Sequence, residues 1–292
     1  MNIFNLPQDI FPDRSKLDDI IFHNYAAETG SYKGKSILHK NAISLVISGE
    51  KTMHFADKMV NVNEDEFHFL SSGNCIVSMN LSGKKHFKSI LIFFDDRILN
   101  DFYLKYNAQI TKFKNNHKVG HELYIAFKKD AFVLNFIASL NLLFQSAIEI
   151  STEMKLLKFE ELMLHLLEKY PAQLLSFQAT KTKYSDDFKI RKAVETNITS
   201  NVSVEELAFL CNVSLSGFKR HFVRMYGTSP SKWLLQKRME IAKELLQHHN
   251  EKPSEVYHKV GYENHSSFTK SFKQSFGITP KQFQLEQLDV QR

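Results

Sequence analysis

The C-terminal third of this chain contains the same sequence pattern twice. Residues 214–233 (SLSGFKRHFVRMYGTSPSKW) align without a gap with residues 264–283 (NHSSFTKSFKQSFGITPKQF), at an offset of 50 positions. The identical pairs are Ser216 and Ser266, Phe218 and Phe268, Phe222 and Phe272, Gly227 and Gly277, and Pro230 and Pro280. Such a repeat predicts two copies of one small supersecondary unit, which restricts the fold of the whole segment.

Each copy predicts one helix and the start of the next. Two Phe residues four positions apart lie on one helix face and anchor it in a core. A Gly then ends the helix, and Ser-Pro or Thr-Pro begins the following one with a capping residue and a Pro in its first turn. Before the first copy, Ser203 and Glu206 have the capping-box spacing of a further short helix. The sequence therefore predicts two helix-turn-helix units.

The excess positive charge lies in the same part of the chain. Lys and Arg number 38 against 32 Asp and Glu, a net charge of +6. Residues 181–292 hold 18 of the basic and 12 of the acidic residues, so residues 1–180 are neutral overall. A basic helical segment joined to a neutral one favours a module that binds a polyanion.

Composition excludes several classes of protein. With 292 residues, 43% of them hydrophobic and 24% charged, the chain has the composition of about two globular domains. Two cysteines, Cys75 and Cys211, are too few for a disulfide framework, and the N-terminal residues lack the pattern of a signal peptide. The uncharged stretch 131–148 has its polar residues on one side, which predicts an amphipathic helix and not a membrane span. We expect a cytoplasmic protein with no membrane contact.

The N-terminal half predicts strands followed by helices. Residues 36–95 contain short β-rich runs separated by turn residues about every ten positions, with hairpin turns expected at 48–50 and 82–84. From Asp96 to Gln178 the pattern is helical, and a polar segment at 179–187 is the expected linker. The predicted fold class is α+β, with a domain of strands followed by helices at 1–178 and an all-α domain at 188–292.

Residues from about 186 to 286 resemble the DNA-binding domain of the AraC/XylS family of bacterial transcription regulators. The motifs that carry the resemblance are V-x-x-LA at 204–208, S-x-S-x-F-x-R-x-F at 214–222, G-x-SP at 227–230, R-x-x-x-A-x-x-LL at 238–246, VGY-x-x-x-S-x-F-x-K-x-FK at 260–273 and G-x-TP at 277–280. The resemblance implies two recognition helices that enter successive major grooves of double-stranded promoter DNA. Tyr257 and Pro253 depart from the small Ala and the Ile that are usual in the second unit of the family.

The residues expected to read bases face away from the Phe pairs. They are Ser216, Lys219 and Arg220 in the first unit, and His265, Ser266, Thr269 and Lys270 in the second. Arg220 is the strongest candidate, because Arg binding a guanine edge with two hydrogen bonds is the commonest specific contact. Lys270 lacks that forked geometry.

A helix expected at 231–248 would be about 27 Å long and could set the two recognition helices about one turn of DNA, roughly 34 Å, apart. Basic residues on it and in the second unit are expected to contact phosphates: Lys232, Lys237, Arg238 and Lys273.

The N-terminal half resembles the cupin-like sensor domain of the same family, in which a β-barrel precedes a helical dimerisation segment. A cupin-type enzyme would need metal ligands with an H-x-H step, which the sequence lacks, and only Glu66 and His68 share a strand face. A DNA-repair methyltransferase would need a reactive Cys in this half, where only Cys75 lies. We therefore expect no enzymatic activity, no metal and no cofactor.

These inferences together predict a transcription regulator that binds RNA polymerase. Its sign of regulation is open between activation, which is the expected one, and repression. The effector of the N-terminal half is open between a small molecule and a protein partner. Homodimerisation is expected through the helices at 130–170, whose apolar stripes consist of Phe136, Leu140, Leu143, Ala147, Leu157, Met163 and Leu167.

Overall fold

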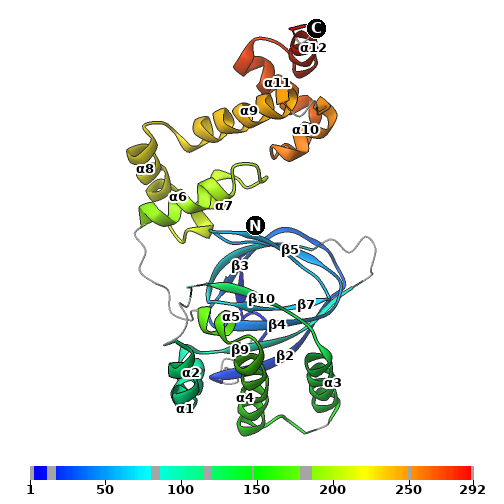
Figure 1. The fold of residues 1–292 in the computed structure, drawn as a ribbon, viewed down its shortest axis with the longest axis vertical. Helices are drawn as coiled ribbons and strands as arrows, with labels where there is room; N and C mark the ends of the chain where they lie inside the picture. Colours follow the sequence, from blue (N-terminus) through cyan, green and yellow to red (C-terminus); the bar gives the residue numbers. More distant parts are fainter. Residues whose placement is uncertain are drawn as a thin grey trace. The chain divides into compact units, whose positions relative to one another are not determined.

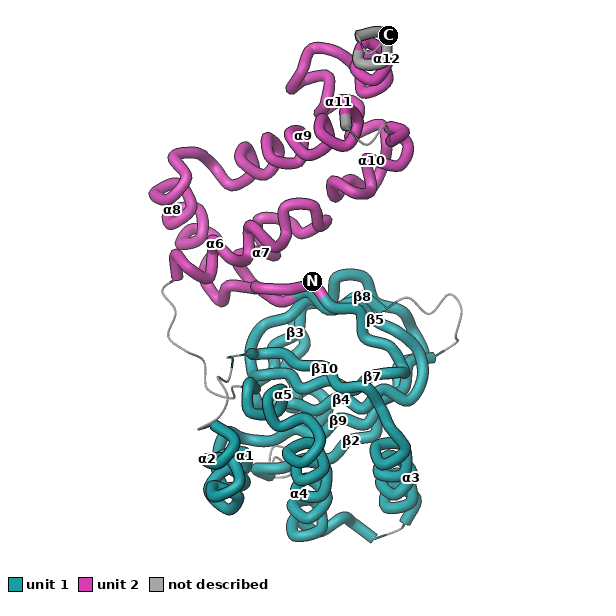
Figure 2. The backbone as a smooth tube through the Cα atoms, viewed as in Figure 1, with its two compact units in different colours: residues 1–54, 60–183 teal, residues 55–59, 184–292 magenta. Residues whose placement is uncertain are grey.

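The computed structural model describes residues 3–11, 18–79, 86–114, 120, 122–146, 148–177, 186–248 and 251–290. The chain contacts divide it into two compact units, one of residues 1–54 and 60–183 and one of residues 55–59 and 184–292 (Figure 2). Most of the expected linker, 179–187, lies outside the described residues, and helix α6 begins at Asp186.

The first unit contains two five-stranded sheets (Figure 1). One has the order β1-β3-β8-β5-β6 and the other the order β10-β7-β4-β9-β2. The strands are β1 Ile3–Leu6, β2 Ile20–Ala27, β3 Ser31–Leu38, β4 Asn41–Ser48, β5 Lys51–His54, β6 Met59–Val62, β7 Glu66–Leu70, β8 Gly73–Met79, β9 Phe87–Phe94 and β10 Tyr124–Lys128.

The six strands from β4 to β9 confirm the runs that the sequence predicts, whereas other details differ. Strands β1, β2, β3 and β10 were not among the predicted runs, and β10 interrupts a stretch expected to be helical. The turn at 48–50 joins β4 to β5, which lie in different sheets, so it is not a hairpin turn. The turn at 82–84 lies outside the described residues. Among the described strands no ladder closes the two sheets into one barrel, so a β-rich domain is shown and a closed barrel is not.

Alternation along the strands gives the second sheet two apolar faces. Ile43, Phe67 and Ile92 point to one face and join a core with helices α1 Asp96–Lys105, α3 Ala131–Gln145, α4 Thr152–Lys169 and α5 Pro171–Ser176. Helix α2 spans Asn107–Lys114 and adds Ile110 to this core. The opposite face looks toward the first sheet and lines a cavity described below.

Most of the apolar stripe expected at a dimer interface is used inside the unit. Phe136, Leu140, Met163 and Leu167 are buried in the core against the sheet, Leu143 is partly buried against it, and Ala147 lies outside the described residues. Leu157 is 61% exposed. The stripe points inward because it covers the apolar face of the sheet. No helix in the described ranges is long and apolar enough to cross a membrane.

The second unit consists of helices, as the sequence predicts. They are α6 Asp186–Thr196, α7 Val204–Leu210, α8 Leu215–Tyr226, α9 Pro230–His248, α10 Pro253–Lys259, α11 His265–Phe276 and α12 Pro280–Val290. Helices α8 and α11 have 12 residues each and the same 50-residue offset as the sequence repeat.

The local signals of the repeat produce the same local structure twice. Ser214 and Asn264 cap α8 and α11, accepting from the amides of residues 217 and 267 at 3.1 and 2.8 Å. Gly227 and Gly277 end the two helices with φ of 68° and 82°, a left-handed conformation that favours glycine. The predicted capping box is present on α7.

Helix α9 takes part in the cores of both helix-turn-helix units. Near its N-terminus, the ring of Trp233 lies 5.8 Å from Phe222 and 5.0 Å from Tyr226, which both belong to α8. Further along, Met239 and Ala242 are fully buried in a cluster whose other buried members are Leu246, Val256, Val260, Phe268, Phe272 and Phe283. The second cluster therefore unites α9 with α10, α11 and α12.

Candidate nucleic-acid interface and a buried cavity

Helix α8 presents a polar outer face. Its Phe218 and Phe222 are completely buried, whereas Ser216, Lys219 and Arg220 are exposed. Within the described ranges, neither Lys219 nor Arg220 forms a hydrogen bond or an ion pair, so both cations are available to a ligand. The structure thus places all three base-reading candidates of the first helix-turn-helix unit on one accessible surface.

Helix α6 holds α8 in place through a cluster that the sequence analysis missed. Asp187 accepts from Nδ1 of His221 at 2.6 Å and from Nη2 of Arg224 at 2.6 Å. Hydrogen bonds from His221 and then Arg224 lower the pKa of the Asp187 carboxyl. Arg224 is therefore engaged within the protein, although it lies on the same helix as the unpaired Arg220.

Helix α11 presents fewer of its candidates. His265, Ser266 and Lys270 are exposed, but Thr269 is only partly exposed, and its hydroxyl is buried with no partner among the described residues. The ring of Tyr257 on α10 lies edge-on to His265, with centroids 5.8 Å apart. The side chain that departs from the family pattern therefore contacts one of the expected base-reading residues.

The residues expected to contact phosphates fall into two groups, those that are exposed and those that are bonded within the domain. Lys232 and Lys273 are exposed, while Lys237 pairs with Glu240 at 2.8 Å and lies over the Trp233 ring. Arg238 differs from the expectation. Its Nε donates to the carbonyl of Ile198 at 2.6 Å and its Nη2 to the carbonyl of Ser200 at 2.7 Å. The guanidinium is thus used inside the domain, through partners about 40 residues away in sequence.

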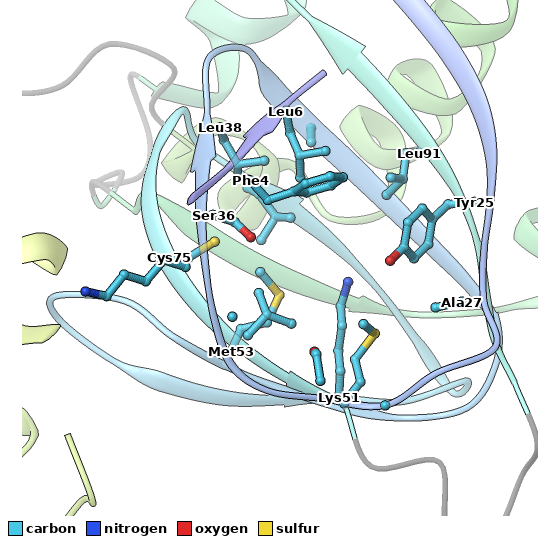
Figure 3. A pocket seen from close by; sticks show the side chains of 18 of the residues that line it. Phe4, Leu6, Tyr25, Ala27, Ser36, Leu38, Lys51, Met53, Cys75 and Leu91 are labelled. Carbon is cyan, nitrogen blue, oxygen red and sulfur yellow. The ribbon is translucent and has the colours of Figure 1, made fainter. Parts of the chain in front are cut away.

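A cavity of about 330 Å³ lies in the first unit (Figure 3). Alternate residues of facing strands line it with mostly apolar groups, among them Tyr25, Leu38, Met53, Cys75 and Leu91. Burial raises the pKa of the Cys75 thiol to about 12, so this cysteine is an inert part of the wall. The volume and the apolar lining suit a small organic molecule.

Lys51 is the notable polar group of this cavity. Figure 3 shows its side chain extending from β5 into the hollow, and its Nζ lies 4.7 Å from the centroid of the Phe87 ring. Burial lowers its pKa to about 8. The part of the chain that the structure describes supplies no carboxylate to pair with it. The cavity therefore combines apolar walls with one uncompensated cation.

The weak metal candidate at Glu66 and His68 finds no support. His68 is fully buried, and its Nδ1 lies 2.7 Å from the hydroxyl of Tyr124. Burial, and then the charges of Lys51 and Lys129, lower the pKa of His68 to about 3. No group of three or more metal-binding side chains occurs among the residues described.

Two family models match separate parts of the chain. Residues 41–177 match the ExsA N-terminal regulatory domain, and residues 207–286 match a helix-turn-helix domain. The virulence regulon transcriptional activator VirF of Yersinia enterocolitica is 20% identical over 249 residues, which are 85% of this chain and 90% of VirF. The chain belongs to the AraC/XylS family. It is a transcription regulator with a DNA-binding helix-turn-helix domain of the AraC type.

Two further relatives are similar over shorter stretches. The regulator LumQ of Photobacterium leiognathi is 27% identical over 111 residues, which are 38% of this chain and 45% of LumQ. The thermoregulatory protein LcrF of Yersinia pestis is 26% identical over 132 residues, 45% of this chain and 49% of LcrF. Among solved structures, ToxT of Vibrio cholerae has 13% identity and a TM-score of 0.38, covering 92% of this chain and 98% of ToxT.

Proposed function

We propose that this AraC-family regulator binds promoter DNA sequence-specifically and activates transcription. The observation that carries the proposal is the pair of equal helices, α8 and α11, each with a buried Phe pair and exposed basic residues on its outer face. A helix of this kind fits the major groove, where base edges differ among the four pairs. VirF, which is similar over most of both chains, is itself named a transcriptional activator.

Base reading is assigned to the exposed side chains of the two helices. Ser216, Lys219 and Arg220 supply it from α8, and Ser266, Lys270 and His265 supply it from α11, where the ring of His265 lies edge-on to that of Tyr257. Lys232, Lys237 and Lys273 contact phosphates, since their ammonium groups lie on the surface of the same unit. We leave Thr269 and Arg238 out of the interface because their polar groups are buried or bound within the domain.

The test is selection of DNA by the full chain. Duplexes with a random central region are bound, recovered and sequenced, and the enriched duplex is then footprinted. Two enriched half-sites about one helical turn apart support reading by both helices. Failure to enrich any sequence over a scrambled duplex contradicts the proposal. Transcription with purified RNA polymerase from a template carrying the selected duplex then tests activation, because a repressor lowers the yield instead.

We also propose that the first unit senses a small molecule with an apolar body and an anionic group. The apolar lining of the cavity favours the binding of a hydrocarbon group. Lys51, which has no carboxylate partner there, favours a negative charge at one end of the ligand. Octanoate should raise the melting temperature of the full chain more than octanol does. Lys51→Met should remove that difference, whereas Lys88→Met, at an exposed position of β9, should keep it. Equal effects of the two probes on the wild type would favour a protein effector.

We propose that homodimerisation uses the outward faces of the helices that the sequence indicated, where Leu157 of the expected stripe is joined by two further leucines. Leu134 and Leu142 on α3 are 57% and 68% exposed, and Leu157 on α4 is 61% exposed. Large apolar side chains that are exposed on two helices are typical of a surface that another chain covers. Sedimentation of the full chain decides the oligomeric state, and a monomer at every concentration contradicts the proposal.

A further inference from the structure

The loop between α6 and α7, residues 197–201, belongs to the first helix-turn-helix unit but contacts the second. Asn201 donates from Nδ2 to Oε1 of Glu263 at 2.5 Å, and Glu263 lies in the turn that precedes α11. The same loop receives both hydrogen bonds of Arg238, which projects from α9. The loop of the first helix-turn-helix unit is therefore bonded both to α9 and to the turn that precedes α11 in the second helix-turn-helix unit.

The closest approach occurs at Gly261. Its φ is 78°, and a Cβ placed there would lie 2.7 Å from the carbonyl oxygen of Thr199 and 2.8 Å from that of Ser200. Real Cβ atoms do not come so close to backbone, so any side chain would push the loop away. Only a glycine allows the two backbones to meet at this distance.

The first helix-turn-helix unit shows that the left-handed turn by itself does not require glycine. Its corresponding turn residue is Asn212, with φ of 57°, and Asn tolerates this conformation. Gly227 and Gly277 also have positive φ, but an added Cβ would meet nothing within 4 Å at either position. Gly261 is therefore distinguished by its neighbour and not by its own backbone angles.

Hydrogen bonds within the loop and to the end of α6 hold the loop that Gly261 contacts. Asn197 is 1% exposed and donates from Nδ2 to the carbonyl of Ala193 at 2.8 Å. The hydroxyl of Ser200 donates to the carbonyl of Asn197 at 3.0 Å. These bonds fix the loop to the end of α6, which belongs to the first helix-turn-helix unit.

Helix α9, with 19 residues and a length of about 28 Å, is the first connection between the two helix-turn-helix units, because it packs against α8 near its N-terminus and against α10 and α11 further along. The contacts of the loop with α9 and with the turn before α11 are a second connection, which restricts rotation of α8 relative to α11 about α9. We propose that residues 197–201, Arg238 and Gly261 form an interunit clamp that fixes the separation and rotation of α8 and α11, and so sets the spacing of DNA half-sites that the protein accepts. The spacing part of this inference rests on the proposed function.

The geometry of the clamp can be measured without DNA. Spin labels attached at Lys219→Cys and Lys270→Cys in the full chain report the distance between α8 and α11. Cys75 and Cys211 are 1% and 3% exposed, so the chain without introduced cysteines serves as the labelling control. The distance distribution should be narrow in the otherwise wild-type chain. It should broaden in Gly261→Ala and stay narrow in the matched control Gly277→Ala, which has the same sign of φ but no neighbour.

Arg238→Met provides a second variant that adds no atoms to the contact. It should broaden the distribution in the same way, because the loop loses both of its bonds to α9. If Gly261→Ala and Arg238→Met both fold and both retain the narrow distribution, the clamp does not hold the units, and the inference is wrong. A circular dichroism spectrum of each variant verifies folding.

The consequence for DNA is a dependence on spacing. Inserting one base pair between the half-sites of the selected duplex shifts the second by about 3.4 Å and rotates it by roughly 35°. The wild type should lose affinity about tenfold or more, since one unit loses base contacts. In Gly261→Ala and Arg238→Met the two spacings should bind within about threefold of each other, as expected for flexibly linked modules.

The same duplexes distinguish the clamp from a phosphate contact. If Arg238 bound a phosphate, Arg238→Met would weaken both spacings equally and lower the salt slope by about 0.9. That result contradicts the clamp, as does a wild type that ignores the inserted base pair. A wild type that selects no duplex contradicts the proposed function, whereas the spin-label distances still test the clamp.

Discussion

Replacing Lys51 by Met should stabilise the first unit at neutral pH. Burial in the apolar cavity lowers the lysine pKa from 10.5 to about 8. The protonated side chain is therefore less stable in the folded chain than in the unfolded chain. A difference of this size corresponds to about 3 kcal/mol, because a tenfold change in an equilibrium constant is about 1.4 kcal/mol. Met keeps the length of the side chain without its charge, so the substitution leaves no large void.

The sign of the pH dependence follows from proton binding. Below pH 8 both states of the wild type carry the proton, and the penalty is fully present. Between about pH 8 and 10.5 the unfolded chain binds the proton that the folded chain has lost, so the free energy of unfolding rises with pH. The advantage of Lys51→Met should thus be largest near pH 7, at about 3 kcal/mol or somewhat less, and should vanish toward pH 10.5.

The two buried cysteines make the assay specific to each unit. Cys75 lies in the first unit and Cys211 in the second, so a pulse of thiol reagent at increasing urea reports the unfolding of each separately. Wild type and variant are compared at the same pH, which cancels the intrinsic reactivity of the thiol. Lys88→Met, on an exposed position of β9, is the control. If the Cys75 transitions of wild type and Lys51→Met coincide at pH 7, the buried cation carries no penalty and the reasoning is refuted.

Further expectations concern DNA, the core and the dimer. Arg220→Ala should cost about 1–3 kcal/mol on the selected duplex and little on a scrambled one; equal losses would mean that this face of α8 does not read bases. Lys273→Ala should weaken both duplexes alike and lower the salt slope by about 0.9, and an unchanged slope contradicts a phosphate contact. Phe268→Ala removes a fully buried ring and should destabilise the second unit by about 3–5 kcal/mol in urea unfolding, against a negligible change if the ring were not in a core. Leu142→Glu and Leu157→Glu should each convert a dimer to a monomer in sedimentation, and a persisting dimer would place the interface elsewhere.

The helix-turn-helix part could be predicted closely because its signals are local. Caps, terminating glycines and Phe pairs act within one or two turns of chain, and the structure forms α8 and α11 at the expected positions. Strand β10 was missed because it is only five residues long and its place in a sheet depends on β7, more than 50 residues earlier in the chain. Sequence patterns show which residues alternate but not which strand pairs with which.

The same limit explains the site residues that differ. Arg238 has the sequence setting of a surface cation, and its carbonyl partners lie 40 and 38 residues away. Thr269 lies near the edge of the apolar face of α11, where a small rotation of the helix decides whether its hydroxyl meets solvent. By contrast, Arg220 lies opposite the Phe pair, and its exposure follows from helical periodicity alone.

Because α9 contributes side chains to the cores of both helix-turn-helix units, neither core can melt without exposing apolar surface that belongs to the other. Trp233 would lose its contact with α8, and Met239 and Ala242 would lose theirs with α10 and α11. The two copies should therefore unfold in a single transition, although each has the size and the pattern of a separate module. The amide hydrogens in the middle of α9 should be the slowest in this domain to exchange with solvent, because they become accessible only when the whole cooperative structure opens.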